Sequence, residues 1–323
     1  MTGLVRQPLT LAFPSKGRLK EQAEAWLGEC GLKLEAVGGA RGYRAAISGL
    51  PGVQVQLLSA GDIAAAVDGG EVHLGLTGED LLRERGEDLD QRVMLLRALG
   101  FGRADLIVAA PQSWIDVDSM VDIDEVAGAY LARTGRRLRV ATKYMSQTRA
   151  FFARHGIADY RIVESSGATE GAPAAGAAEL VVDITTTGAT LAANSLKIIG
   201  DGVILKSQAQ LAASLTASWT KAQIVLLRRF LSIIEAKARA RGLATVIWPA
   251  EHDKAAQSAC AHFVAEGATG RVNGLLVSSH QLFDLAAALA ESGIGPVSVT
   301  RPDYVFEADC PAADALAAKV LTA

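Results

Sequence analysis

The chain has 323 residues and a nearly balanced charge, with 32 Lys and Arg against 35 Asp and Glu. This length is too great for one small domain and predicts two or three domains with separate cores. The balanced charge argues against nucleic-acid binding through bulk charge. Half of the residues are hydrophobic, but charges interrupt every apolar stretch before it reaches about 18 residues, so no membrane span is predicted.

Cysteine and histidine usage points to a reduced compartment. The three cysteines lie far apart, at positions 30, 260 and 310, which fits the cytoplasm better than a disulfide framework. The N-terminus shows no long apolar region before a small-residue cleavage site, so no signal peptide is expected. The five histidines are scattered and no Cys-x-x-Cys occurs, so the sequence lacks zinc-site spacing. We therefore expect a cytoplasmic protein that ligates no metal directly.

Short apolar runs alternate with helical patterns over the first two thirds of the chain. Strands are predicted at 9–13, 53–58, 72–76, 93–96, 104–110, 138–142, 160–164, 180–184 and 203–207. Helices are predicted at 19–30, from about 62, from about 79, and at 122–132, 147–155, 168–178 and 191–197. Such alternation is typical of open α/β sheets, in which ligands bind outside the carboxyl ends of strands. We expect two lobes with a cleft between them: residues 1–104 with 196–220 as lobe I, and 105–195 as lobe II.

The last third of the chain predicts a separate domain. Residues 220–241 form one long amphipathic pattern, whose broad apolar face favours a packed connecting helix. Strands at 245–248, 274–277 and 296–300, with helices at 253–266 and 281–292, indicate a small α/β module. A further helix is expected within 310–323. Residues 221–323 are thus predicted to be a connecting helix and a C-terminal domain.

The segment ELVVDITTTGATLAANSLK carries the clearest chemical signal. An apolar strand delivers Asp183 to its carboxyl end, a threonine-rich turn with one glycine follows, and a helix starts at once. Backbone N–H groups and hydroxyls then converge on one point, where a phosphate can bind and Asp183 can accept hydrogen bonds from ribose hydroxyls. Gly188 lets the backbone approach the anion closely. The predicted cradle for a 5-phosphoribosyl group comprises Asp183, Thr186, Thr187, Gly188, Ala189 and Thr190.

The alternative interpretation of this segment is an ordinary strand–turn–helix with threonine caps. The common phosphoribosyltransferase loop usually has two adjacent acidic residues at this point, whereas Val182 precedes Asp183 here. Together with the rest of the chain, the loop instead resembles the ATP phosphoribosyltransferase family. Seven blocks carry the resemblance: PSKGRL (14–19), DI (62–63), GLTGEDL (75–81), LGFG (99–102), ATKY (141–144), ESSGATEGAP (164–173) and the loop from Asp183 to Leu196.

This resemblance implies an α/β fold of two lobes like a periplasmic binding protein, with a cleft between them, plus a small C-terminal α/β domain. It implies transfer of the phosphoribosyl group of phosphoribosyl pyrophosphate (PRPP) to N1 of the ATP adenine, with Mg²⁺, as the first step of histidine biosynthesis. Departure of pyrophosphate leaves an oxocarbenium-like ribose, so such an enzyme needs positioning and charge stabilisation more than covalent help. No residue is therefore assigned a covalent or acid–base role.

Further candidates for binding ATP or pyrophosphate lie outside the loop. Lys16, Gly17 and Arg18 follow the first strand and are placed to meet polyphosphate; the alternative is a solvated basic turn. Glu79 and Asp80 open a helix, where they either face the cleft or complement the helix dipole. Glu170 is a candidate for substrate contact or marks a helix entry. Ala104 and Asp105 stand where many family members have Cys-Arg, which leaves Arg103 as a substitute cation.

The length matches the family's long form, whose C-terminal ferredoxin-like domain binds histidine as a feedback inhibitor. The stretch between Glu266 and Leu275 leaves room for one strand, where a βαββαβ fold needs a hairpin of two, so we expect a ferredoxin-like or degenerate module. The family's short form relies on a separate regulatory subunit, so a regulatory partner for this chain remains an alternative. The resemblance also implies a homo-oligomer, either a dimer or a hexamer. The alternative functions are a two-lobed small-molecule sensor and a non-catalytic regulatory subunit.

Overall fold

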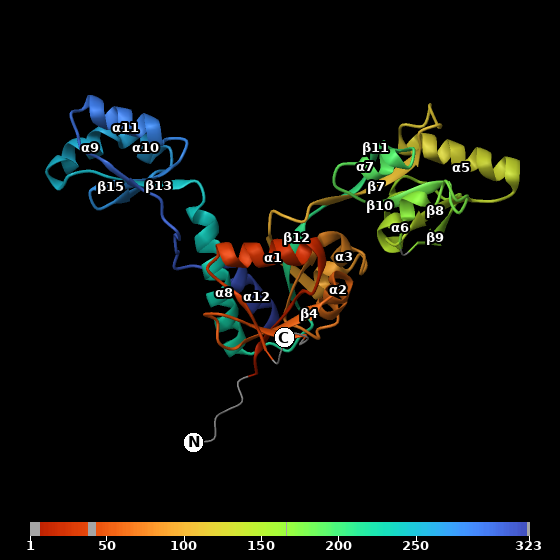
Figure 1. The fold of residues 1–323 in the computed structure, drawn as a ribbon, viewed down its shortest axis with the longest axis horizontal. Coiled ribbons are helices and arrows are strands. Elements are labelled where there is room, and N and C mark those ends of the chain that lie inside the picture. Colours follow the sequence, from red (N-terminus) through yellow and green to blue (C-terminus); the bar gives the residue numbers. More distant parts are fainter. Residues whose placement is uncertain (1–6, 38–42, 166, 322–323) are drawn as a thin grey trace, which may run out of the picture. The chain divides into compact units, whose positions relative to one another are not determined.

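The computed structural model describes residues 7–37, 43–165 and 167–321 and divides into two compact units. Unit 1 contains the chain through Gly28, Leu32–Gln223 and the residues from Leu316 onward. Unit 2 contains Glu29–Gly31 and Ile224–Ala315. Unit 1 carries two sheets and unit 2 carries one (Figure 1). No helix in the described part of the chain is long and apolar enough to cross a membrane.

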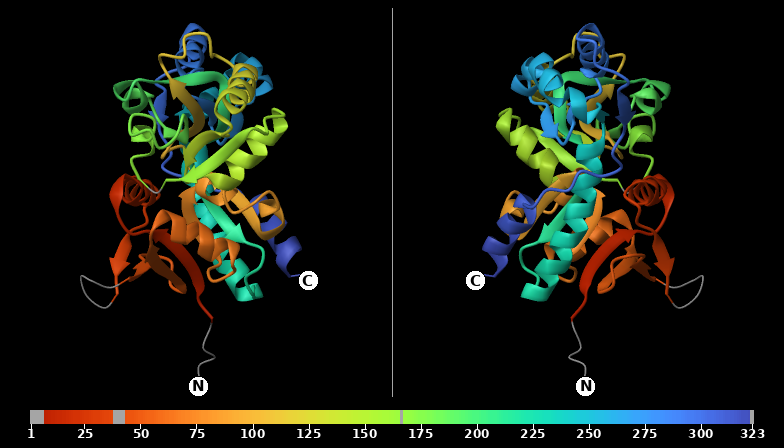
Figure 2. Two further views of the ribbon diagram at one scale, coloured as in Figure 1. Left: turned by 90° about the vertical axis from the view of Figure 1, so that its right-hand side faces the viewer. Right: turned by 90° about the vertical axis from the view of Figure 1, so that its left-hand side faces the viewer.

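Lobe I of unit 1 is built on a seven-stranded sheet with strand order β2-β3-β4-β1-β5-β12-β6. Its centre is parallel, because β1 pairs in parallel with β4 and with β5, and β1 is visible in Figure 2 as the red arrow. Its strands are β1 (Leu9–Pro14), β2 (Leu34–Ala36), β3 (Arg44–Ile47), β4 (Val53–Leu58), β5 (Leu74–Gly78), β6 (Val93–Ala98) and β12 (Ala209–Ser214). Its helices are α1 (Gly17–Glu29), α2 (Ala60–Asp68), α3 (Glu79–Arg83) and α4 (Leu89–Arg92).

Lobe II of unit 1 is built on a five-stranded sheet with strand order β11-β7-β10-β8-β9. Strand β10 pairs in parallel with β8 and antiparallel with β7. The strands are β7 (Ala104–Pro111), β8 (Leu138–Thr142), β9 (Tyr160–Glu164), β10 (Leu180–Thr185) and β11 (Leu196–Ser207). The helices are α5 (Met120–Thr134), α6 (Met145–Arg154) and α7 (Ala189–Ala193), with one 3₁₀ turn at Thr169–Gly171.

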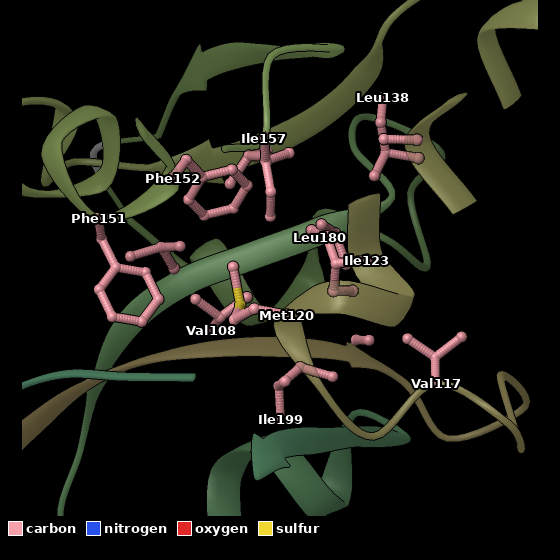
Figure 3. Packing of buried hydrophobic residues seen from close by; sticks show 14 of the residues in the cluster. Val108, Val117, Met120, Ile123, Leu138, Phe151, Phe152, Ile157, Leu180 and Ile199 are labelled. Carbon is pink, nitrogen blue, oxygen red and sulfur yellow. The ribbon is translucent and has the colours of Figure 1, made fainter. Parts of the chain in front are cut away.

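The core of lobe II lies between this sheet and its helices (Figure 3). Met120 and Ile123 reach it from α5 and Phe152 reaches it from α6, and all three side chains are fully buried. Helix α5 begins where Ser119 accepts from the Asp122 N–H while the Asp122 carboxylate accepts from the Ser119 N–H, which is a capping box. The cap and the buried face together fix where this helix starts and which side it presents to the sheet.

The chain crosses between the two sheets twice, from β6 to β7 and from β11 to β12 (Figure 1). The two crossings are joined by backbone hydrogen bonds from Leu99 N to Ala209 O (2.9 Å) and from Ala209 N to Phe101 O (3.0 Å). In a double crossing of this kind a few residues at element ends can absorb a change in lobe orientation, which is the geometry that a hinge requires.

Unit 2 contains most of the long helix α8 (Lys221–Ala240) and the ferredoxin-like module that follows this helix in the chain. Its sheet has the order β14-β15-β13-β16, and every neighbouring pair is antiparallel. Helices pack on one face of this sheet (Figure 1). The elements are β13 (Leu243–Ile247), a 3₁₀ turn (Ala250–His252), α9 (Asp253–Ala259), α10 (Ala261–Ala265), β14 (Thr269–Arg271), β15 (Gly274–Ser278), α11 (Leu282–Glu291) and β16 (Ser298–Thr300). The last helix, α12 (Pro311–Val320), begins in unit 2 and ends in unit 1.

The expectation of a missing hairpin strand in this module is wrong. Strands β14 and β15 form a hairpin in which Arg271 pairs with Gly274. The turn between them needs only two residues, and Asn273 takes a left-handed φ of 50° there, as Asn does more readily than most residues. The strand β14 was missed because its three residues, Thr-Gly-Arg, are all exposed and show no alternation of apolar and polar positions.

Other predicted elements also differ from the structure. The helix expected at 168–178 is one 3₁₀ turn followed by non-helical turns, because Pro173 and Gly176, with φ of +66°, interrupt it. Helix α7 ends at Ala193, and β11 already begins at Leu196. Residues 196–207 therefore belong to the sheet of lobe II rather than to that of lobe I, and only β12 returns to lobe I.

We expect Phe152→Ala to lower the free energy of unfolding of unit 1 by about 3–5 kcal/mol, because it removes a fully buried ring and leaves a cavity. Ile115→Ala is the control, since Ile115 lies in the same lobe and is 79% exposed. Urea unfolding followed by circular dichroism measures both variants. Equal losses of stability in the two variants would contradict the assignment of this core.

Candidate active site

The loop after β10 lines a cavity of about 530 Å³ in unit 1. The predicted cradle residues Asp183, Thr186, Thr187 and Thr190 line it, and Gly188 and Ala189 lie between the last two in the chain. Arg18, from the first turn of α1, and Glu170, from the 3₁₀ turn, complete the wall. The structure therefore brings together predicted residues from three distant segments of the sequence.

The loop holds its shape through its own hydroxyls. Gly188 has a φ of +74° and donates its N–H to Thr185 Oγ1 (2.9 Å), and Ala189 N–H donates to Thr187 Oγ1 (3.4 Å). Thr186 Oγ1 donates to the backbone oxygen of Arg103 at 3.3 Å. A side chain at Gly188 would be strained in this left-handed conformation. Thr187 and Thr190 are exposed and line the cavity, so their hydroxyls can donate to a phosphate, whereas the Thr186 hydroxyl already donates to Arg103.

Asp183 stands at the end of β10, where the strand leaves the core. Burial raises the pKa of its carboxyl, and the negative charge of Glu170 adds to the rise. The N–H of Ile184 donates to Asp183 Oδ1 at 2.8 Å. This hydrogen bond and the positive charge of Lys143 offset part of the rise in the pKa of Asp183. The Thr169 hydroxyl also lowers this pKa by hydrogen bonding to the carboxylate. A half-buried carboxylate at the wall of the cavity can accept hydrogen bonds from hydroxyls such as those of a ribose.

A second hollow of about 390 Å³ adjoins the cavity, and Ala104, Thr185 and Thr186 line both. Arg103 and Lys206 give this hollow two cations. Arg103 was considered as a substitute cation from sequence, but Lys206 and Lys143 were not singled out. Lys206 sits at the end of β11, and its place next to the loop follows only from the pairing of β11 with β7.

The structure does not bring every predicted site residue to the cavity. Asp80 is buried and accepts hydrogen bonds from Tyr144 and Ser207, and neither it nor Glu79 lines the cavity. Glu79 accepts from Gln210 Nε2 at 2.8 Å. Lys16 is exposed in the turn beside Arg18, and Gly17 starts α1 with a φ of +74°. No cluster of three or more His, Cys, Asp or Glu gathers within the described residues in a way that could hold a metal ion.

Two α/β lobes joined by two crossings, and a loop whose hydroxyls and carboxylate line a cavity beside several cations, are an arrangement suited to binding a sugar phosphate. The sequence profile of the family described as ATP phosphoribosyltransferase matches residues 59–235. The ATP phosphoribosyltransferase of Caulobacter vibrioides is 73% identical over 300 residues, which cover 93% of this chain and 94% of that protein. That of Bradyrhizobium sp. is 50% identical, with coverage of 94% and 96%. The chain belongs to the ATP phosphoribosyltransferase family.

A solved structure supports the fold independently. It is described as an ATP phosphoribosyl transferase (HisG:HisZ) complex from Thermotoga maritima, with 24% sequence identity and a TM-score of 0.53. The match covers 70% of this chain and 98% of that chain. At this identity it supports the fold alone, whereas the sequence relatives, aligned over 93% or more of this chain, extend into the C-terminal module as well.

We expect Asp183→Asn to raise stability at neutral pH. A raised pKa means that the folded state disfavours the ionised carboxylate, so Asp183 costs stability above its folded pKa and nothing below its ordinary value of 3.8. Urea unfolding of both proteins between pH 8 and pH 4.5 tests this, and the stability difference should shrink as the pH falls. An Asn variant that is less stable than the wild type at pH 8 would contradict the desolvation of Asp183.

Proposed function

We propose that the chain transfers the 5-phosphoribosyl group of PRPP to N1 of the ATP adenine and releases pyrophosphate. Membership of the ATP phosphoribosyltransferase family makes this the first step of histidine biosynthesis. The observation that carries the proposal is the loop of Asp183 and residues 185–190, which faces a cavity of about 530 Å³. A sensor or a non-catalytic subunit is not favoured, because relatives that share 73% and 50% of their residues with this chain are named as the transferase.

The 5-phosphate of PRPP would bind at Thr187, Gly188, Ala189 and Thr190. Exposed hydroxyls and a left-handed glycine suit an anion there, since the backbone can approach it without a Cβ in the way. The ribose hydroxyls would donate to Asp183, one turn earlier. Binding at these two points fixes the sugar and leaves its C1 open to the attacking adenine nitrogen, which is the positioning that a dissociative reaction needs.

The pyrophosphate would leave toward the cations of the second hollow. Arg103 and Lys206 line that hollow, and Arg18 lines the adjoining cavity. Cations set where negative charge develops stabilise the departing group. Mg²⁺ would arrive with the substrate, because this ion keeps several waters and commonly binds phosphate oxygens with one or two carboxylates. Asp183 and Glu170 are the carboxylates of the cavity, and the Mg²⁺ would be held by the substrate phosphates rather than directly by these side chains.

Pyrophosphate release tests the reaction. We expect the purified chain to release pyrophosphate when given ATP, PRPP and Mg²⁺, and the double variant Thr187→Val/Gly188→Val to lose at least about 100-fold in activity, as a displaced binding group typically costs. Gly135→Ala is the control for backbone strain, since Gly135 caps α5 with a φ of +66° and lies outside the cavity. Its strain of about 1–2 kcal/mol should leave activity intact. Full activity in the loop variant would refute the site.

We further propose that histidine binds the C-terminal module and inhibits the enzyme. The complete βαββαβ order of this module supports a regulatory domain of the long form, as does its place within the aligned region of the relatives. Self-contained regulation makes a separate subunit unnecessary. The partner in the Thermotoga maritima complex belongs to that protein. A homo-oligomer, dimer or hexamer, is proposed as the working assembly.

We expect histidine, added to the purified chain alone, to inhibit pyrophosphate release without raising the KM for PRPP, because the module is separate from the phosphoribosyl cavity in sequence and core. Calorimetry with histidine and steady-state kinetics measure binding and inhibition, and arginine serves as the control amino acid. Absence of both binding and inhibition would contradict the proposed regulation by histidine. Analytical ultracentrifugation of the same sample measures its oligomeric state.

A further inference from the structure

A network of buried hydrogen bonds joins α3 of lobe I to lobe II, and the proposed reaction does not use it. Asp80 is 6% exposed, and its Oδ2 accepts from the Tyr144 hydroxyl at 2.6 Å. Its Oδ1 accepts from Ser207 Oγ at 2.9 Å, and its own N–H donates to Ser207 Oγ at 3.0 Å. Tyr144 directly precedes α6 and Ser207 ends β11. One carboxylate of lobe I therefore holds two elements of lobe II.

Glu84 makes a second contact of the same kind. Its carboxylate accepts from the N–H groups of Ser146 (2.7 Å) and Gln147 (3.2 Å), in the first turn of α6. These N–H groups lack partners within the helix, and the helix dipole favours a negative charge at this end. Gln147 Nε2 also donates to the backbone oxygen of Asp80 at 2.9 Å. We call Asp80, Glu84, Tyr144 and Ser207 the inter-lobe anchor.

The local sequence is fitted to this contact. A Cβ on Gly78 would lie 2.3 Å from Asp80 Oδ1, so only glycine leaves room for the carboxylate in this position. Leu81, the next residue, packs against the hydrophobic core of lobe II. Apolar contact holds the lobes together but does not fix an angle, whereas hydrogen bonds to a buried carboxylate are directional and costly to leave unmade.

The anchor is connected to the phosphoribosyl cavity through one residue. The Lys143 ammonium lies 5.0 Å from the ring centroid of Tyr144, and its charge acts on Asp183. Burial, with the nearby charge of Asp80, raises the pKa of Tyr144, so the phenol stays protonated and remains a donor. The ring to which Asp80 is hydrogen-bonded thus also contacts the cation whose charge acts on Asp183.

We propose that Asp80 and Tyr144 are a positioning pair for phosphoribosyl transfer. Their hydrogen bond sets the orientation of lobe II, with Lys143 and Asp183, relative to lobe I, without contact with the substrate. The inference rests on the proposed function, because that function identifies the cavity as the binding site of PRPP. It assigns Asp80 to lobe orientation rather than to ATP or pyrophosphate.

The test measures the KM for PRPP and the kcat of each variant separately. Tyr144→Phe keeps the ring and its contact with Lys143 but removes the hydroxyl from Asp80. If the binding-competent orientation then falls to about one fifth of the population, the KM for PRPP rises about fivefold. The kcat should change less than about twofold, because bound substrate restores the orientation before the chemical step. Asp80→Asn keeps one acceptor oxygen for the Tyr144 hydroxyl, and its amide N–H can donate to Ser207 Oγ in place of the contact that Ser207 now donates, so its KM should stay near that of the wild type. Asp80→Ala should resemble Tyr144→Phe.

Tyr130→Phe is the matched control. Tyr130 also donates its hydroxyl to a carboxylate, Glu179 Oε1 at 3.1 Å, but both residues lie in lobe II. We expect its KM to equal that of the wild type. The double variant Tyr144→Phe/Asp80→Ala should raise KM no more than the larger single change, since both remove one interaction. A Tyr144→Phe variant with unchanged KM, or with a lowered kcat alone, would overturn the proposal.

A second measurement reads lobe orientation without turnover. Spin labels at Glu24→Cys in α1 and Glu125→Cys in α5 occupy exposed positions of the two lobes, and the native cysteines are all buried. We expect Tyr144→Phe, or Ser207→Ala if that variant is unstable, to broaden the inter-label distances and PRPP to narrow them again. Unchanged inter-label distances in these variants would overturn the proposal that the inter-lobe anchor sets lobe orientation. A wild-type chain that binds PRPP but releases no pyrophosphate would refute the proposed reaction and leave this test intact.

Discussion

The site depends on how strand β10 ends. Its first three residues are buried between β7 and β8, and Asp183 is where the strand leaves the core. The chain must then turn into α7 within a few residues, and the left-handed conformation of Gly188 makes that turn possible. Threonine side chains and a carboxylate line one cavity as a result. Arg18, Arg103 and Lys206 from other parts of unit 1 line this cavity and the hollow beside it.

The cations come from segments that are distant in sequence. Arg18 belongs to the first turn of α1 after β1, Arg103 to the first crossing and Lys206 to the end of β11. A polyphosphate can therefore engage both lobes and the hinge between them. Enzymes that gather their charges this way gain from closure, because a lobe movement brings the cations toward the charge that develops and excludes water.

Much of this could be predicted from sequence because the pattern is local. The strands β4, β8 and β9 have the predicted ends, and the loop after β10 is one continuous motif. Strand β12 could not be predicted in this way: AQLAAS is buried throughout and lacks both alternation and β-branched residues, so it shows neither period nor propensity. Lys206 was missed for a related reason, since only the non-local pairing of β11 with β7 places it beside the loop.

Asp80 shows a further limit of local patterns. From sequence, an acidic residue opening a helix faces a cleft, a substrate or the helix dipole, and all three assume an exposed side chain. The structure buries this carboxylate against Tyr144, which is 64 residues away in the chain. A buried carboxylate is tolerated only when its oxygens accept hydrogen bonds. The partners of Asp80 belong to lobe II, so a change in lobe orientation would break these hydrogen bonds. Charge at this position is therefore used within the protein, whereas the exposed cations Arg18, Arg103 and Lys206 line the cavity and the hollow beside it.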